Sequence, residues 1–188
     1  YVVYKVSGLP KNKVIGSGTV LDTARLRYMV ADYLQVSSKN VHAYIMGEHG
    51  DSSFVSWTNS YIGCKSIIDI LKDRNEDLSV LNKIYKEVQQ AAYEIINRKK
   101  ATYYGIGVAL AKLVKTILND EHEILTVSTY LDGEYDQKDI FIGVPAILTS
   151  SGVQETLNLK LSDEEKQKME KSCQTLRETI KSIENEIN

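Results

Sequence analysis

The chain has 188 residues, of which 43% are hydrophobic and 26% are charged, an ordinary composition for a soluble globular domain with a core of its own. Its 23 basic and 25 acidic residues give a net charge of −2, which argues against nucleic-acid binding. No apolar run approaches the roughly 20 residues that cross a bilayer, and no signal-peptide pattern opens the chain. We therefore expect a cytoplasmic protein with no nucleic-acid or membrane partner.

The N-terminal region predicts a turn, a short strand and a helix. Residues 7–10 have turn composition, and residues 13–15 suit a short strand. Residues 22–34 predict a helix with its apolar residues on one face. The chain opens with YVVYKV rather than with a methionine, and we expect these residues to continue a helix from a longer polypeptide.

Asp22 and Arg25 are three residues apart at the start of the predicted helix. This spacing places a carboxylate and a guanidinium on one helical face, where both can reach the same site. The alternative is structural: Asp22 caps the helix, and Arg25 forms a solvated surface pair with it.

The segment 41–53 places a histidine directly after a predicted strand. Residues 41–46 alternate with the period of a half-buried strand, and Gly47 ends the alternation. The sequence Glu-His-Gly-Asp follows. Such a loop can hold His49 at a cleft, although a lone histidine also suits a structural role.

The middle of the chain predicts short strands followed by long helices. Residues 54–68 are rich in β-branched and aromatic residues, which predicts one or two short strands. Apolar residues recur at helical spacing over 78–97, a long amphipathic helix, and again over 106–118.

The C-terminal third predicts an antiparallel strand pair and a terminal helix. Residues 124–130 and 140–148 suit two strands joined by a turn, and Pro145 favours an edge or an irregular strand end for the second. Ser162 and Glu165 form a capping box. The apolar stripe of the following helix favours packing on its own domain, with a coiled coil as the alternative.

The order of these elements predicts an α+β fold, a twisted antiparallel sheet packed with long helices, without a βαβ repeat. Neither glycine-rich stretch, 16–18 or 105–107, completes the GxGxxG pattern of a dinucleotide-binding fold. Cys64 and Cys173 lie far apart and lack zinc-ligand spacing. We expect two free thiols and no metal site.

Four motifs together resemble the lactate/malate dehydrogenase family. They are GSGTVLDTAR at 16–25, GEHGDS at 47–52, ATYYGIG at 101–107 and ILTVSTYLDG at 124–133. The resemblance covers essentially the whole chain. It implies that residues 1–188 are a substrate-binding and catalytic domain, and that the family's N-terminal dinucleotide-binding domain is absent.

The resemblance also implies a reaction, the reduction of pyruvate to L-lactate with NAD as the cofactor. His49 would be the proton donor, Asp22 would accept from its other ring nitrogen, and Arg25 would bind the substrate carboxylate. These residue types suit the roles, because a carboxylate favours the imidazolium form and a guanidinium offers a carboxylate a planar fork of donors. Thr102 would lie beside the substrate, and Ser17 near the nicotinamide. The plain alternatives are a helix N-cap for Thr102 and a turn for Ser17.

Two more positions match a regulatory site of the family's bacterial allosteric members, which are activated by fructose 1,6-bisphosphate. Arg27 is two residues after Arg25, about 200° around a helix, and so faces away from the active site. His42 precedes His49 by seven residues. We expect Arg27 and His42 to bind this activator across a subunit interface of a homotetramer. Two idle surface residues are the alternative.

Two other functions remain open. The substrate could be malate or another 2-hydroxy acid, because the substrate-discriminating loop of the family belongs to the absent half. The chain could also be a non-catalytic oligomerising fragment. We expect the 188 residues alone not to reduce pyruvate.

Overall fold

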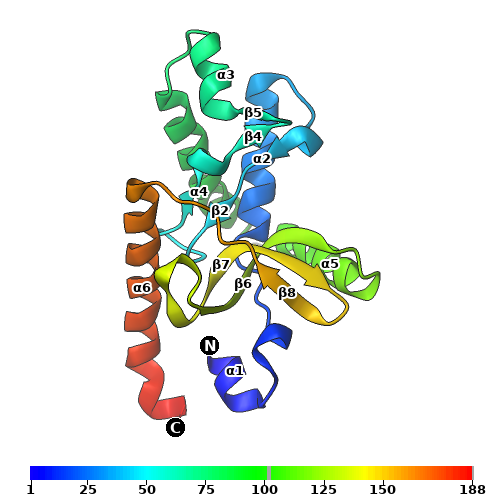
Figure 1. Cartoon of the computed structure of the whole chain (residues 1–188), viewed down its shortest axis with the longest axis vertical. Coiled ribbons are helices and arrows are strands. Elements are labelled where there is room, and N and C mark those ends of the chain that lie inside the picture. Colours follow the sequence, from blue (N-terminus) through cyan, green and yellow to red (C-terminus); the bar gives the residue numbers. More distant parts are fainter. Residues whose placement is uncertain (101–102, 188) are drawn as a thin grey trace.

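The computed structural model describes residues 1–100 and 103–187 and has an α+β architecture (Figure 1). Its α-helices are α1 (Val2–Ser7), α2 (Val20–Leu34), α3 (Ile67–Asp73), α4 (Ser79–Lys99), α5 (Tyr104–Leu118) and α6 (Asp163–Ile187). Its strands are β1 (Val41–His42), β2 (Ile45–Met46), β3 (Phe54–Val55), β4 (Tyr61–Ile62), β5 (Lys65–Ser66), β6 (Glu123–Asp132), β7 (Lys138–Thr149) and β8 (Gly152–Thr156). Short 3₁₀ turns are η1 (Lys11–Lys13), η2 (Ser38–Asn40), η3 (Trp57–Asn59) and η4 (Glu134–Asp136).

The largest sheet has the order β6-β7-β8 and is antiparallel throughout. Two smaller antiparallel sheets join β1, β4 and β5, and β2 and β3. The predicted α+β class is confirmed, although the described residues form three antiparallel sheets in place of one. α2 and α4 lie above the large sheet in Figure 1, and α6 runs along its left side.

One cluster of core residues packs α2, α3 and α4 against β1 and β2, and two further clusters lie along β7. Met169 and Cys173 of α6 are buried against the first half of β7, and Ala109 and Leu113 of α5 pack near its second half. The apolar stripe of α6 therefore packs on its own domain where it is buried, which confirms that prediction.

The helix boundaries follow the apolar periodicity closely for α4 and α5. The capping box of α6 is confirmed: the backbone N–H of Ser162 donates to the Glu165 carboxylate at 2.9 Å, and that of Glu165 donates to the Ser162 hydroxyl at 3.3 Å. α2 begins two residues before the predicted start, at Val20, and Thr19 is its N-cap residue. Asp22 is thus inside the first turn and is not the cap.

Two local predictions in the first half of the chain are wrong. Residues 13–15 do not form a strand, because η1 occupies Lys11–Lys13 and the next ladder contact is a single bridge between Gly16 and Ser128. The segment 54–68 holds three short strands rather than one or two. It also contains the start of α3, where the Ser66 hydroxyl accepts from the backbone N–H of Asp69 at 3.1 Å.

Pro145 lies inside β7, the central strand, and not at a strand end. Its carbonyl accepts from the backbone N–H of Leu157, one residue beyond the end of β8. The nitrogen of a strand residue points to the same side as its carbonyl. The missing N–H therefore faces the carbonyl of Leu157, which accepts from the Tyr135 hydroxyl instead. The pairing loses one backbone bond at Pro145, and that carbonyl still has a donor.

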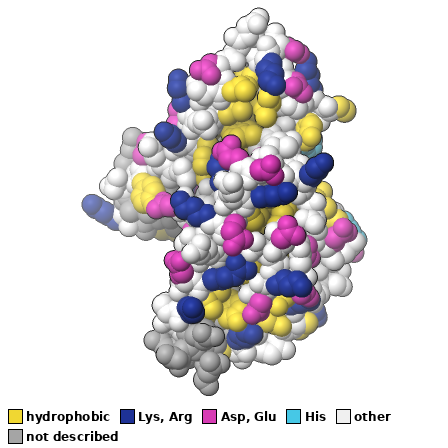
Figure 2. All heavy atoms as spheres, turned by 60° about the vertical axis from the view of Figure 1, so that its left-hand side comes forward, with side chains coloured by type: hydrophobic (Ala, Val, Ile, Leu, Met, Phe, Trp, Pro, Cys, Tyr) yellow, Lys and Arg dark blue, Asp and Glu magenta, His cyan; other side chains and the backbone are white. Residues whose placement is uncertain are grey.

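Acidic and basic side chains are interspersed over the face shown in Figure 2, in keeping with the net charge of −2. Among the residues that the structure describes, no helix combines the length and the apolar character that a membrane span requires.

Candidate functional site

The first turn of α2 is fastened to β2 by two buried threonines. The Thr19 hydroxyl donates to the carbonyl of Ile45 at 2.6 Å, and the backbone N–H of Ile45 donates to the Thr23 hydroxyl at 3.0 Å. The Thr126 hydroxyl of β6 donates to Thr23 at 2.9 Å. These bonds fix the start of α2, which carries Asp22, relative to the strand that leads to His49.

The loop after β2 turns sharply at Gly47. Its φ of 101° lies where side chains are disfavoured, and Gly47 bridges Gly143 of β7. At the far end of the loop, the Tyr85 hydroxyl of α4 donates to the carbonyl of Ser53. Burial raises the pKa of Tyr85 to about 12, so this hydroxyl keeps its proton near neutral pH.

The structure brings Asp22, Arg25 and His49 together. Nδ1 of His49 lies 2.9 Å from Oδ2 of Asp22, and Nη1 of Arg25 donates to Oδ1 of the same carboxylate at 3.1 Å. The Asp22 and Arg25 side chains are only 18% and 19% exposed, whereas His49 is 62% exposed. The Asp22–Arg25 pair is thus largely buried and is not a solvated surface pair.

The surroundings of His49 favour its charged form. The hydrogen bond to Asp22 raises the pKa of the imidazole above its usual value of 6.5, partial burial opposes the shift, and the negative charge of Asp22 adds to it. Arg25 lowers this pKa and Glu48 raises it, each by a smaller amount. The outcome is a histidine that retains its proton to higher pH than a free imidazole.

A pocket of about 270 Å³ opens beside His49, between the loop and α4. Its size is near the lower end for small-molecule sites. Its walls combine two carboxylates, an imidazole, an amide, hydroxyl groups and apolar side chains. They are formed by Asp22, Ile45, His49, Gly50, Asp51, Ser53, Tyr85, Val88, Gln89 and Tyr93.

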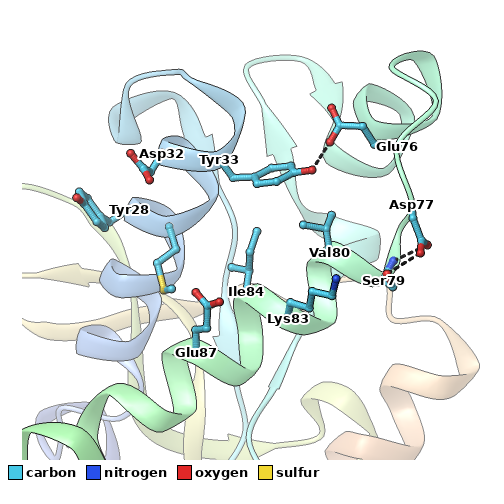
Figure 3. Close-up of a pocket in the computed structure, with 11 residues that line it drawn as sticks. Tyr28, Asp32, Tyr33, Glu76, Asp77, Ser79, Val80, Lys83, Ile84 and Glu87 are labelled. Atoms are coloured by element: carbon cyan, nitrogen blue, oxygen red, sulfur yellow. Dashed lines mark hydrogen bonds between the residues drawn. The ribbon is translucent and has the colours of Figure 1, made fainter.

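A larger hollow of about 660 Å³ lies elsewhere, between α2 and the start of α4. Figure 3 shows its side chains, with Tyr33 reaching across from α2 to Glu76 and Ser79 capped by Asp77. None of the predicted site residues lines it.

Arg27 and His42 are placed by different elements. Nε of Arg27 donates to the carbonyl of Ala43 at 3.1 Å, and the guanidinium carbon lies 5.0 Å from the ring centre of Tyr44. Arg27 is therefore not an idle solvated cation. His42 is exposed on β1, opposite Tyr61 of β4.

Ser17 lies just before α2, where its carbonyl accepts from the backbone N–H of Val20. Thr102 falls outside the described residues.

Three hydroxyl residues that support this site were not predicted from the sequence: Thr19, Thr23 and Ser172. Ser172, on α6, accepts a hydrogen bond from the backbone N–H of Glu48 at 2.6 Å. All three are buried. A hydroxyl residue within an apolar helical stripe, as Ser172 is beside Cys173, is a usable signal of such a contact. It does not identify the partner, which here is 124 residues away.

Comparison with known proteins places this geometry in a family. The chain is 50% identical over 184 residues to L-lactate dehydrogenase 1 of Bacillus cereus (strain ATCC 10987 / NRS 248), covering 97% of this chain and 59% of that protein. It is 50% identical over 187 residues to L-lactate dehydrogenase 2 of Bacillus anthracis, with the same coverage. The chain thus spans about three-fifths of the length of these relatives.

Solved structures agree with this. A lactate dehydrogenase named MGS-M5, from a Medee basin deep-sea metagenome library, superposes with a TM-score of 0.93 at 46% identity, covering 97% of this chain and 60% of that one. The ligand-bound minor L-lactate dehydrogenase from Enterococcus mundtii gives 0.92 at 44% identity, over 96% and 58%. Residues 19–187 match the lactate/malate dehydrogenase α/β C-terminal domain. The chain belongs to the lactate/malate dehydrogenase family and carries that family's C-terminal domain.

Proposed function

We propose that the chain is the substrate-binding and proton-transferring half of an NAD-dependent L-lactate dehydrogenase, which reduces pyruvate to L-lactate in the cytoplasm. The observation that carries the proposal is that Arg25 and His49 both contact the carboxylate of Asp22, beside a pocket that Asp22 and His49 line, in a chain that is 50% identical to L-lactate dehydrogenases.

His49 donates a proton to the carbonyl oxygen of pyruvate and recovers it from the hydroxyl of lactate in reverse. Because Asp22 bonds Nδ1, it holds the ring so that Nε2 serves the substrate. The raised pKa of His49 keeps the donor protonated to higher pH than a free imidazole. Arg25 binds the substrate carboxylate through its guanidinium. Thr102 lies beside the substrate in this proposal.

In this proposal, most of the contacts to NAD come from residues outside the 188-residue chain. Every strand pair in the described part of the chain is antiparallel, whereas dinucleotide-binding folds are built on a parallel sheet. These residues do not by themselves fit the whole cofactor. We place Ser17 near the nicotinamide, and a separate dinucleotide-binding domain must hold the rest. Bound NADH supplies the hydride.

Because the relatives are longer than this chain, the proposal can be tested by supplying the part that only they contain. The chain is fused behind the N-terminal part of Bacillus cereus L-lactate dehydrogenase 1 that it does not match, which gives a joined enzyme. We expect the joined enzyme to oxidise NADH with pyruvate and to prefer it to oxaloacetate. The 188-residue chain alone should not oxidise NADH. A preference for oxaloacetate would assign a malate dehydrogenase instead. If the joined enzyme and its His49→Gln variant have equal activity, His49 is not the proton donor.

A further inference from the structure

Ser172 is completely buried, and its hydroxyl lies against the start of the loop that carries His49. The backbone N–H of Glu48 donates to Ser172 Oγ at 2.6 Å. A Cβ atom at Gly47 would come within 2.6 Å of the same oxygen. The close approach of α6 to this loop therefore depends on the absence of a side chain at residue 47.

The same hydroxyl also reaches the far side of the loop. Ser52 Oγ lies 3.1 Å from Ser172 Oγ, and the Ser52 hydroxyl donates to the Glu48 carboxylate. Each hydroxyl has a single proton. Since Ser52 gives its proton to Glu48, Ser172 must donate to Ser52. Ser172 thus accepts from the residue before His49 and donates to the residue three after it.

His49 needs such support because its side chain is 62% exposed, so surrounding atoms restrain the ring weakly. The direction of the imidazole then depends on the backbone that carries it. A misplacement of about 1 Å at a reacting group can cost about 100-fold in rate. The loop between Glu48 and Ser52 is therefore the part whose geometry matters most.

We propose that Ser172 is a positioning residue for His49: its one hydroxyl ties Glu48 and Ser52 to α6, and so keeps the imidazole in contact with Asp22. The proposal rests on the proposed function, because positioning serves catalysis only if His49 is the proton donor. The hydrogen-bonded circuit itself can be tested without any catalytic assay.

The readout is the NMR titration of His49 in the 188-residue chain. The charged groups that act on this ring are Asp22 and Arg25 from α2 and Glu48 from the loop. Ser172→Ala removes both bonds of the hydroxyl. We expect the pKa of His49 to fall toward its ordinary value, by at least half the fall that Asp22→Asn causes, because the contact with Asp22 is then formed for less of the time.

Two matched variants on the same helix separate positioning from loss of packing. Thr179→Ala removes an exposed hydroxyl that bonds only within α6 as far as the structure describes it. Cys173→Ala removes a buried sulfur next to Ser172, and should lower stability while leaving the His49 titration unchanged. If Cys173→Ala shifts the pKa as much as Ser172→Ala, the effect is general loosening of α6 and the proposal fails.

Hydrogen exchange of the Glu48 amide gives a second test that needs no variant. Because this N–H donates to a buried oxygen, it should be protected in the unaltered chain. Exchange as fast as in an open loop overturns the proposal, and so does an unchanged His49 titration in folded Ser172→Ala. An inactive joined enzyme alongside both expected results would instead count against the proposed function alone.

Discussion

Asp22 and His49 are 27 residues apart in the sequence and 2.9 Å apart at their side-chain tips, where Nδ1 meets Oδ2. The other oxygen of Asp22 accepts from Arg25. A single, mostly buried carboxylate thus orients both the imidazole and the guanidinium. Any change at Asp22 should therefore act on two groups at once, through charge and through geometry.

Asp22→Asn should lower the pKa of His49. The amide offers the ring a weaker hydrogen bond than the carboxylate and carries no charge, so both interactions by which Asp22 raises the pKa of His49 are reduced. The Asp22–His49 bond contributes stability below the unfolded pKa of about 6.5, and that stability is lost as the pH rises through the higher folded pKa. The variant should lose this extra stability at acid pH. NMR titration and urea unfolding at pH 5 and pH 9 measure the two effects.

His122 provides the internal control for that titration. It is an exposed histidine near Asp120 and lies on a different part of the chain, so its titration should be the same in wild type and Asp22→Asn. A His49 titration that is equally unaffected would mean that the Asp22 charge does not act on the ring.

Arg25→Lys should raise the KM for pyruvate in the joined enzyme. A lysine keeps the charge but replaces a planar fork with a single ammonium group. Each charge-assisted hydrogen bond contributes about 1.5–3 kcal/mol, so the loss of one corresponds to a KM roughly 10- to 100-fold higher. Arg74→Lys, at an exposed site outside the pocket, should leave KM unchanged. Equal KM values for the two variants would remove Arg25 from the carboxylate site.

Long-period patterns predicted this fold better than short ones. The apolar residues of α4, α5 and α6 recur over several turns. α4 and α5 were predicted close to their observed bounds, and the start of α6 was predicted from its capping box. α3 was missed because Ile67 and Ile68 favour strands, although Ser66 followed by Asp69 is a helix-capping signal. β8 was missed because an edge strand of five residues carries little periodicity.

The residues of the candidate site were also only partly predictable from local sequence patterns. Sequence motifs selected Asp22, Arg25 and His49, but spacing within a helix relates only the first two. The contact with His49 depends on α2 crossing β2, which the hydroxyls of Thr19 and Thr23 fix through long-range bonds. Such bonds join residues more than 20 positions apart, and no local pattern specifies them.

Gly18 provides a prediction about the support of α2. Its φ is 51°, and a Cβ there would lie 2.5 Å from the backbone nitrogen of Ser128 and 2.8 Å from the carbonyl oxygen of Thr126. Gly18→Ala must therefore displace the segment before α2 from β6. Gly63 has a similar φ of 57° and open space around it. Gly63→Ala should therefore lower the free energy of unfolding only by the cost of a side chain in left-handed backbone, about 1–2 kcal/mol. We expect Gly18→Ala to cost clearly more than this control in urea unfolding. Equal costs would show that the approach to β6 is not tight.

The last prediction concerns regulation. We propose that Arg27 and His42 bind fructose 1,6-bisphosphate between subunits of a homotetramer. Nε of Arg27 is occupied by the carbonyl of Ala43, the residue after His42. The two Nη groups take no part in that bond, and they are the donors we assign to a phosphate.

Activation of the joined enzyme by the bisphosphate should weaken in Arg27→Gln and in His42→Ala. Loss of one charge-assisted contact of about 1.5–3 kcal/mol should raise the half-activating concentration roughly 10- to 100-fold. Imidazole attracts phosphate only when protonated, so activation should also weaken as the pH rises from 6 to 8. Arg74→Gln and His122→Ala remove the same residue types from other exposed sites and should respond as wild type does. Because an activator must prefer the active assembly to the inactive one, sedimentation at each bisphosphate concentration should show more tetramer as activity rises. Equal activation in wild type, Arg27→Gln and His42→Ala would rule out this site.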